Sequence, residues 1–167
     1  MANLKDKLNV LDLILTKNLM WISNADTKAT ILFGINSAML GVLAALVPFP
    51  EQWTPLAIFF TSVTGLILVT SIIFLVSVAF PILKGPGNSL IYFGGIASYE
   101  QQKYVDRVLK GINHELLVDF AKQCYRNAEI AKIKYEFINK AVIFAVIALP
   151  FWLASIWFLY PLKFTTP

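Results

Sequence analysis

The chain has 167 residues, a net charge of +4 and a hydrophobic fraction of 57%, but only 14% of its residues are charged. A soluble domain usually carries about 25% charged residues and has too little interior to hide this much apolar surface. The composition therefore excludes an ordinary water-soluble fold and predicts an all-α integral membrane protein built as one domain.

Residues 1–28 predict an amphipathic helix. Apolar residues recur there at spacings of three or four, as they do along one face of a helix. They are Leu4, Leu8, Leu11, Leu15, Leu19 and Ile22. No Pro or Gly separates this segment from the apolar run that follows, so both are expected to belong to one long helix.

Three apolar runs without charges lie at residues 29–47, 56–80 and 141–162. A bilayer core about 30 Å thick needs about 20 helical residues, and each run is long enough. Buried core helices are the alternative for such runs. We predict three transmembrane helices, with the lipid bilayer as their partner.

Polar and small residues within the runs predict how these helices pack. Ser37, Gly41 and Ala45 form a small-residue ridge with a spacing of four, which permits close approach of helices and predicts a homo-oligomer. Asn36 is the most polar residue of any run, and we expect it to hold helices together. The hydroxyl residues of the second run, such as Thr64 and Ser71, are expected either to pack or to line a narrow polar path.

Residues 81–140 predict a helical region outside the lipid. Pro81, Gly85 and Pro86 break the helix first, and a helix is expected over residues 97–110, ending at Gly111. The next helix should start at Asn113 and run into the third span. Its heptad seam consists of Leu117, Ala121, Cys124, Ala128, Ala131, Tyr135 and Ile138.

The opposite side of this last helix is also apolar near the lipid, at Ile130, Ile133 and Phe137. A helix with two apolar faces needs two partners. We expect one partner from the same chain and one from a second subunit. Shallow insertion of these side chains among lipid headgroups is the alternative.

Lysine and arginine assign the sides of the membrane. Residues 1–28 hold four of them and residues 81–140 hold nine, whereas the loop between the first two runs holds none and the tail holds Lys163. By the positive-inside rule, the N-terminus and the region 81–140 face the cytoplasm. Trp53, Trp157 and Tyr160 then lie near the outer interface, where such rings prefer to sit.

The sequence does not predict an enzyme. It contains no G-x-S-x-G, H-E-x-x-H or Walker A motif. One histidine, His114, and one cysteine, Cys124, cannot form a Cys/His metal cluster. We expect no catalytic residue, no cofactor, no metal and no nucleic-acid partner.

Four stretches resemble a known family. They are residues 21–29 (WISNADTKA), Pro81 with residues 88–97 (NSLIYFGGIA), residues 116–135 with Asp119, Gln123, Asn127, Ala128, Ile130 and Lys134, and the run into the third span. In this arrangement the chain resembles the Pycsar transmembrane effector family of bacterial antiphage defence.

The resemblance implies a function. In that family a companion cyclase makes cyclic CMP or cyclic UMP after phage infection, and the effector responds by impairing the bacterial inner membrane, so that the infected cell stops growing or dies. A small oligomeric scaffold or channel-like protein, whose cytoplasmic stalk docks a partner, is the alternative.

If the cytoplasmic helices sense the nucleotide, Arg126 and Arg107 are candidates for its phosphate, because a guanidinium can bind it with two parallel hydrogen bonds. The alternative is that Arg126 pairs with an acid such as Asp119 or Asp26. Other candidates offer rings for stacking or amides for reading the base edge. They are Tyr92, Phe93 and Tyr104, and Asn88, Gln123 and Asn127.

Overall fold

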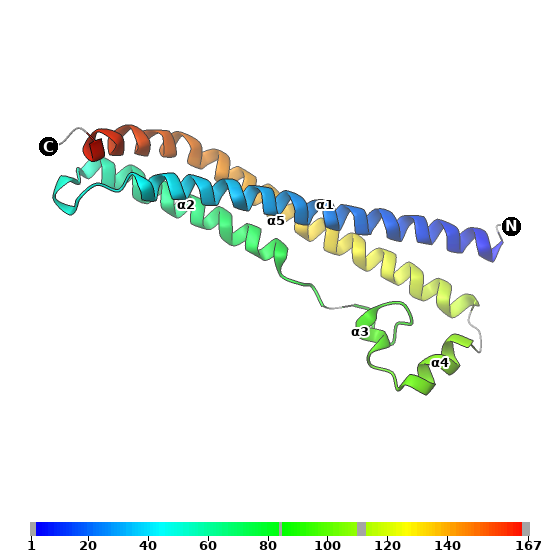
Figure 1. Ribbon diagram of the computed structural model, residues 1–167. Coiled ribbons are helices and arrows are strands. Elements are labelled where there is room, and N and C mark those ends of the chain that lie inside the picture. The colour runs from blue at the N-terminus through cyan, green and yellow to red at the C-terminus, as the bar shows by residue number, and fades with distance from the viewer. Residues whose placement is uncertain (1–2, 84, 110–112, 165–167) are drawn as a thin grey trace. The chain divides into compact units, whose positions relative to one another are not determined.

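The computed structural model describes residues 3–83, 85–109 and 113–164, and it is all helical there, with 85% helix and no strand. The elements in chain order are α1 (Leu4–Ala45), a short 3-10 helix (Pro50–Gln52), α2 (Pro55–Ala79), α3 (Phe93–Ile96), α4 (Gln101–Leu109) and α5 (Asn113–Phe164) (Figure 1). The prediction of three helices that are long and apolar enough to cross a membrane is confirmed for α1, α2 and α5.

The chain divides into two compact units. The apolar unit consists of residues 26–80 and 135–167, and the polar unit consists of residues 1–25 and 81–134. Helices α1 and α5 contribute residues to both units, because neither is interrupted at the boundary.

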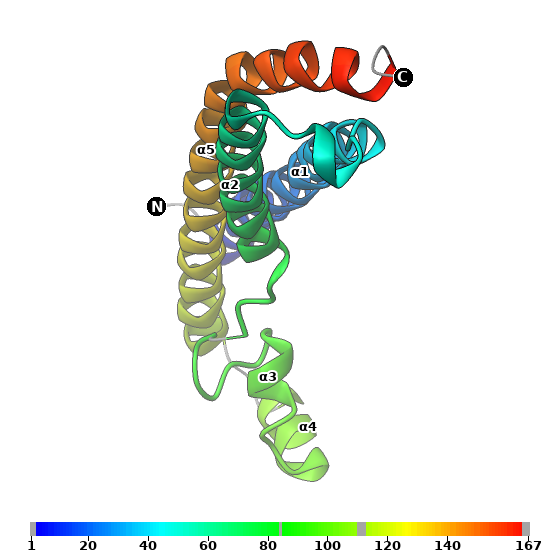
Figure 2. The same ribbon diagram turned by 90° about the vertical axis from the view of Figure 1, so that its left-hand side faces the viewer.

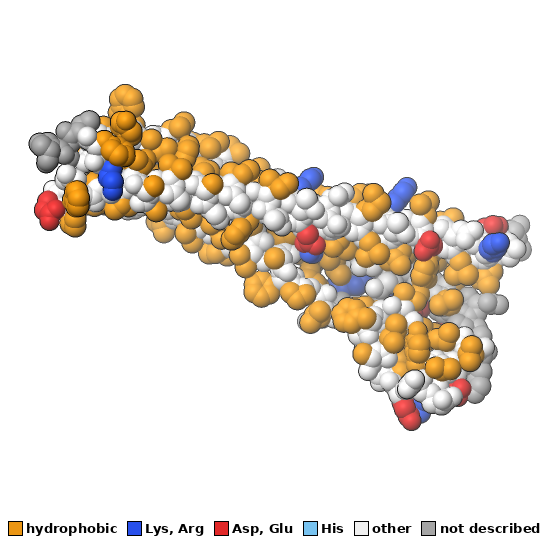
Figure 3. Space-filling view, viewed as in Figure 1, with side chains coloured by type: hydrophobic (Ala, Val, Ile, Leu, Met, Phe, Trp, Pro, Cys, Tyr) orange, Lys and Arg blue, Asp and Glu red, His pale blue; other side chains and the backbone are white. Residues whose placement is uncertain are grey.

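Large hydrophobic side chains cover the outside of the apolar unit (Figure 3). Leu66, for example, is 71% exposed, and Ile31 and Val146 are each 58% exposed. Such a surface is unfavourable in water and suits lipid. Inside the unit, Met39, Leu68 and Ala148 form one cluster of buried residues, and Leu43, Ala57 and Leu159 form a second.

Polar side chains are also buried inside the apolar unit. Asn36 donates from Nδ2 to the Ser71 hydroxyl (2.7 Å), which in turn donates to the backbone oxygen of Ala141 (2.8 Å). The hydroxyls of Thr64 and Ser155 lie 3.0 Å apart. Because water does not compete for these bonds in an apolar environment, they tie α1, α2 and α5 together.

In the polar unit, the first half of α1 has one inward-facing side with heptad spacing. Inward-facing positions alternate at spacings of four and three from Leu4 to Ala25, and this register includes Asn18. Asn18 is 3% exposed and donates from Nδ2 to the backbone oxygen of Cys124 (2.8 Å). The prediction of Leu19 on this face is wrong, since Leu19 is 50% exposed and Asn18 takes its place.

The register of α5 also differs from the predicted seam. Cys124, Ala131 and Ile138 are buried as expected, but Ala121 and Ala128 are exposed in the single chain. Between Cys124, Ala131 and Ile138, the other buried positions are Asn127 and Lys134. Both registers alternate spacings of three and four, so the spacing does not distinguish them. Hydrophobicity favoured the apolar residues over their polar neighbours.

The second apolar face of α5 finds a partner within the same chain. The ring of Phe137 lies 6.3 Å from that of Phe74 on α2, and Phe144 lies 5.5 Å from Phe74. The partner expected from the same chain is thus supplied at Phe137 by α2, and the partner from a second subunit stays a prediction.

Two short helices follow the segment after α2 in the polar unit (Figure 2). Helix α3 was not predicted, and α4 begins at Gln101 instead of residue 97 because residues 97–99 form a turn. The expected end of the helix at Gly111 lies outside the described residues, and so does the side chain of Asn113.

Candidate functional site

An open hollow of about 370 Å³ lies on the polar unit, between the segment after α2, helix α4 and the first turns of α5. Its lining residues are Gly87, Asn88, Leu90, Arg107, His114, Glu115, Val118, Asp119 and Lys122. The α5 residues form two rows with a spacing of four, His114–Val118–Lys122 and Glu115–Asp119, which places them on one helix face. The volume falls in the range of about 300–1,000 Å³ that small-molecule sites occupy.

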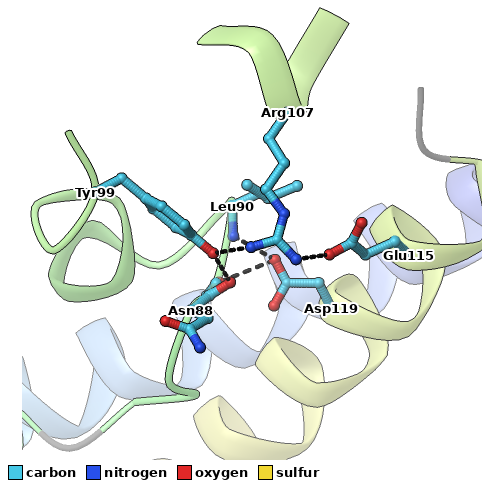
Figure 4. Close-up of polar contacts among 7 residues, drawn as sticks. Asn88, Leu90, Tyr99, Arg107, Glu115 and Asp119 are labelled. Carbon is cyan, nitrogen blue, oxygen red and sulfur yellow. Dashed lines mark hydrogen bonds and ion pairs between the residues drawn. The ribbon is translucent and has the colours of Figure 1, made fainter. Parts of the chain in front are cut away.

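Asp119 anchors the segment that forms one wall of the hollow (Figure 4). Its Oδ2 accepts hydrogen bonds from the backbone N–H of Leu90 (2.7 Å) and from the hydroxyl of Ser89 (3.0 Å). Asp119 is 9% exposed and Ser89 is 1% exposed. Hydrogen bonds to an ionised acceptor are about twice as strong as neutral ones, so this carboxylate fixes the wall on α5.

Ser89 shapes the turn that leads into α3. Its hydroxyl oxygen accepts from the backbone N–H of Ile91 (3.1 Å) and of Tyr92 (2.8 Å). Gly95 packs directly on this turn, because a Cβ there would meet the backbone N of Ser89 at 2.7 Å and its O at 2.8 Å. Glycine permits this close approach because it has no Cβ. Ser89 and Gly95 together therefore shape the wall of the hollow.

A chain of polar contacts joins the other side of the hollow (Figure 4). Arg107 on α4 donates from one terminal nitrogen to Glu115 on α5 and from the other to the hydroxyl of Tyr99 (2.8 Å). The Tyr99 hydroxyl donates to the backbone oxygen of Asn88 (2.6 Å). Asn88 has a φ of 55°, an uncommon conformation that asparagine tolerates better than most residues.

The lining combines groups of both charges. Arg107, Lys122 and His114 are N–H donors suited to an anion such as a phosphate. Asp119 and Glu115 are acceptors suited to the hydroxyls of a ribose or to the N–H groups of a base. The hollow is therefore equipped for a ligand that carries a negative group and hydrogen-bond donors together.

The structure brings two of the predicted ligand residues to the hollow, namely Arg107 and Asn88. Tyr104 supports its wall, because its hydroxyl donates to the backbone oxygen of Leu90 (3.2 Å). Tyr92 and Phe93 lie at the start of α3 with their ring centroids 4.7 Å apart, and neither lines the hollow.

The remaining predicted ligand residues lie further along α5 and do not line the hollow. Arg126 pairs with an acid, as the alternative expected, and its partners include Glu129, three residues away, at 3.0 Å. Asn127 is 7% exposed, and the side-chain oxygen of Gln123 is buried without a hydrogen-bond partner among the described residues.

Sequence reasoning missed the α5 residues of the hollow, His114, Glu115, Asp119 and Lys122. Their spacing was visible, because they share a helix face at the start of the helix. That the segment around Ser89 packs on this face is a tertiary contact, which no local pattern encodes. Among the residues that the structure describes, no cluster of three or more potential metal ligands occurs.

The residues predicted to pack membrane helices fall on different faces of α1. Asn36 is fully buried inside the apolar unit, whereas Ser37, Gly41 and Ala45 are exposed. A Cβ added at Gly41 would meet nothing within 4 Å. The small-residue ridge therefore has no partner helix within the described chain.

The chain matches the model of a known protein family. A family model described as the Pycsar effector protein domain (PycTM) matches residues 10–160 of the 167-residue chain. The matched range includes every residue that lines the hollow and parts of both units. No curated protein and no solved structure matches the chain.

Proposed function

The chain belongs to the Pycsar effector family, and from this premise we propose that it senses a cyclic pyrimidine mononucleotide, cyclic CMP or cyclic UMP, and then impairs the bacterial inner membrane. The observation that carries the proposal is the family match over residues 10–160. The proposal assigns no catalytic step to the chain.

The two units suit the two parts of this function. The hollow of the polar unit offers Arg107, His114 and Lys122 to the single negative charge of a cyclic phosphodiester. The apolar unit exposes hydrophobic side chains along three helices and suits lipid. Because α1 and α5 belong to both units, a rearrangement of these helices in the polar unit has a direct path into the membrane.

The proposal includes an orientation. With nine lysine and arginine residues in 81–140 and four in 1–28, the hollow faces the cytoplasm, where a nucleotide cyclase releases its product. It also includes a homo-oligomer, since a second copy of α1 can pack on the exposed ridge of Ser37, Gly41 and Ala45.

The proposal can be tested in bacteria that express the chain with a cyclase. Production of cyclic CMP or cyclic UMP is expected to collapse the signal of a potential-sensitive dye and to stop growth. A cyclase that makes cyclic AMP serves as the matched control. If growth and potential are unchanged with both pyrimidine nucleotides, the chain is not such an effector, and a partner-docking scaffold becomes the better account.

A further inference from the structure

The contact between Arg107 and Glu115 lies at the rim of the hollow, and both residues line it. Their side chains are 43% and 50% exposed, so water and salt reach the pair. Exposed ion pairs of this kind contribute little to stability. The pair therefore joins α4 to the start of α5 by a contact that another anion can replace at small cost.

A carboxylate and a phosphate compete for the same guanidinium surface. Both present two oxygens to the planar fork of an arginine, and both form charge-assisted hydrogen bonds with it. While Glu115 is bound to Arg107, the guanidinium charge is neutralised, and among the described lining residues Lys122 is the other Lys or Arg side chain. Glu115 thus occupies the group that an incoming phosphate needs most.

Resting on the proposed function, we propose that the phosphate of the cyclic nucleotide binds Arg107 in place of the Glu115 carboxylate. Lys122 and His114 line the same hollow and supply further N–H donors to the phosphate. Asp119 keeps its bonds to Ser89 and Leu90, so the opposite wall stays in place. Glu115 acts as a built-in competitor that weakens nucleotide binding and holds α4 to α5 until the ligand arrives.

The bond of Arg107 to the Tyr99 hydroxyl survives the exchange, because it uses the other terminal nitrogen of the guanidinium. Arg107 therefore remains oriented by Tyr99 and by the backbone oxygen of Asn88. After the exchange the phosphate replaces Glu115 as the link between α4 and the start of α5, because His114 donates to it as well.

The test is calorimetric titration of the purified full chain in detergent with cyclic CMP and with cyclic UMP. Glu115→Gln removes the competing charge, so the Kd for the bound nucleotide is expected to fall about two- to fivefold. Glu100→Gln is the matched control, since Glu100 also forms an exposed ion pair, with Lys103 (3.1 Å). This substitution changes the net charge by the same amount as Glu115→Gln. Arg107→Gln is expected to abolish binding.

The gain of affinity in Glu115→Gln is the decisive readout, because misfolding does not tighten binding. Wild-type binding together with an unchanged or weaker Glu115→Gln overturns the exchange and leaves the proposed function standing. An equal gain in Glu100→Gln also overturns it, since net charge would then explain the effect. If the wild-type chain binds neither nucleotide, the proposed function fails, and the ligand named here fails with it.

Discussion

Gly95 is the residue that lets α3 rest against the turn at Ser89, and the hollow depends on that turn. A methyl group there would overlap backbone atoms of Ser89, which lack the freedom of a side-chain end. At Gly87, in the same segment, a Cβ would meet nothing within 4 Å. The two glycines therefore differ in what they tolerate, although both lie close to the site.

Gly95→Ala is expected to destabilise the polar unit by about 1–3 kcal/mol, the usual cost of overpacking. Gly87→Ala is expected to change stability little. Thermal unfolding in detergent, followed by circular dichroism, measures the difference. Equal melting temperatures for the two variants would show that α3 does not pack on Ser89 as described.

Cys124 reports on the packing of α1 against α5 in the polar unit. It is 5% exposed, and its Sγ lies 3.2 Å from the backbone oxygen of Leu11. Burial raises the pKa of the Cys124 thiol, because the thiolate loses solvation there. The reactive form is the thiolate, so the folded chain holds less of it at any given pH than the unfolded chain does.

Alkylation of Cys124 is expected to be slower in the folded chain than in the denatured chain. Its rate should also keep rising to higher pH over about pH 7–10, since the raised pKa delays formation of the thiolate. A maleimide reagent followed by mass spectrometry measures both rates. Identical pH profiles for the folded and denatured chains would contradict the burial of this thiol.

Among single residues, the sequence identified those whose chemistry is conspicuous. Arg107 was found because arginines are rare in this chain, and Asn88 because its amide suits a base edge. Asp119 was missed as a site residue, because its role depends on the backbone N–H of Leu90. A residue that binds a distant backbone group leaves no local pattern.

At the scale of elements, the long helices were predictable from the sequence. The residues that each helix buries against its neighbours were predictable only in part. Long apolar runs predicted α1, α2 and α5, because a backbone in lipid must satisfy its own hydrogen bonds and a helix does so. Polar residues in the buried register of α1 and α5 escaped prediction at Asn18, Asn127 and Lys134. Asn18 is accommodated by its bond to Cys124, a contact between residues 106 positions apart.

The register of α5 can be tested by placing a glutamate at a buried position and, separately, at an exposed position three residues away. Ala131 is 5% exposed, and Ala128 is exposed. Ala131→Glu buries an unpaired charge and is expected to lower stability by several kcal/mol, roughly 3 or more. Ala128→Glu is expected to leave the fold of the single chain intact. Thermal melts that rank the two variants in the reverse order would restore the register predicted from the sequence.

At the scale of the whole molecule, the proposed oligomer depends on the exposed ridge of α1. Gly41→Leu adds a large side chain where the single chain has space. The variant is expected to keep the wild-type circular dichroism spectrum and to lose chemical crosslinks between copies. Asn36→Leu is the contrasting change, because Asn36 bonds Ser71 within the chain. Wild-type crosslinking by Gly41→Leu would place the interface elsewhere.

The measurement that tests the central claim most directly uses the purified chain in liposomes that hold a potassium gradient. A potential-sensitive dye reports the membrane potential while cyclic CMP, cyclic UMP or cyclic AMP is present on both sides. Our account predicts loss of the potential with at least one pyrimidine nucleotide and a stable potential with cyclic AMP. A potential that persists with both pyrimidine nucleotides, or that is lost equally without any nucleotide, would contradict it.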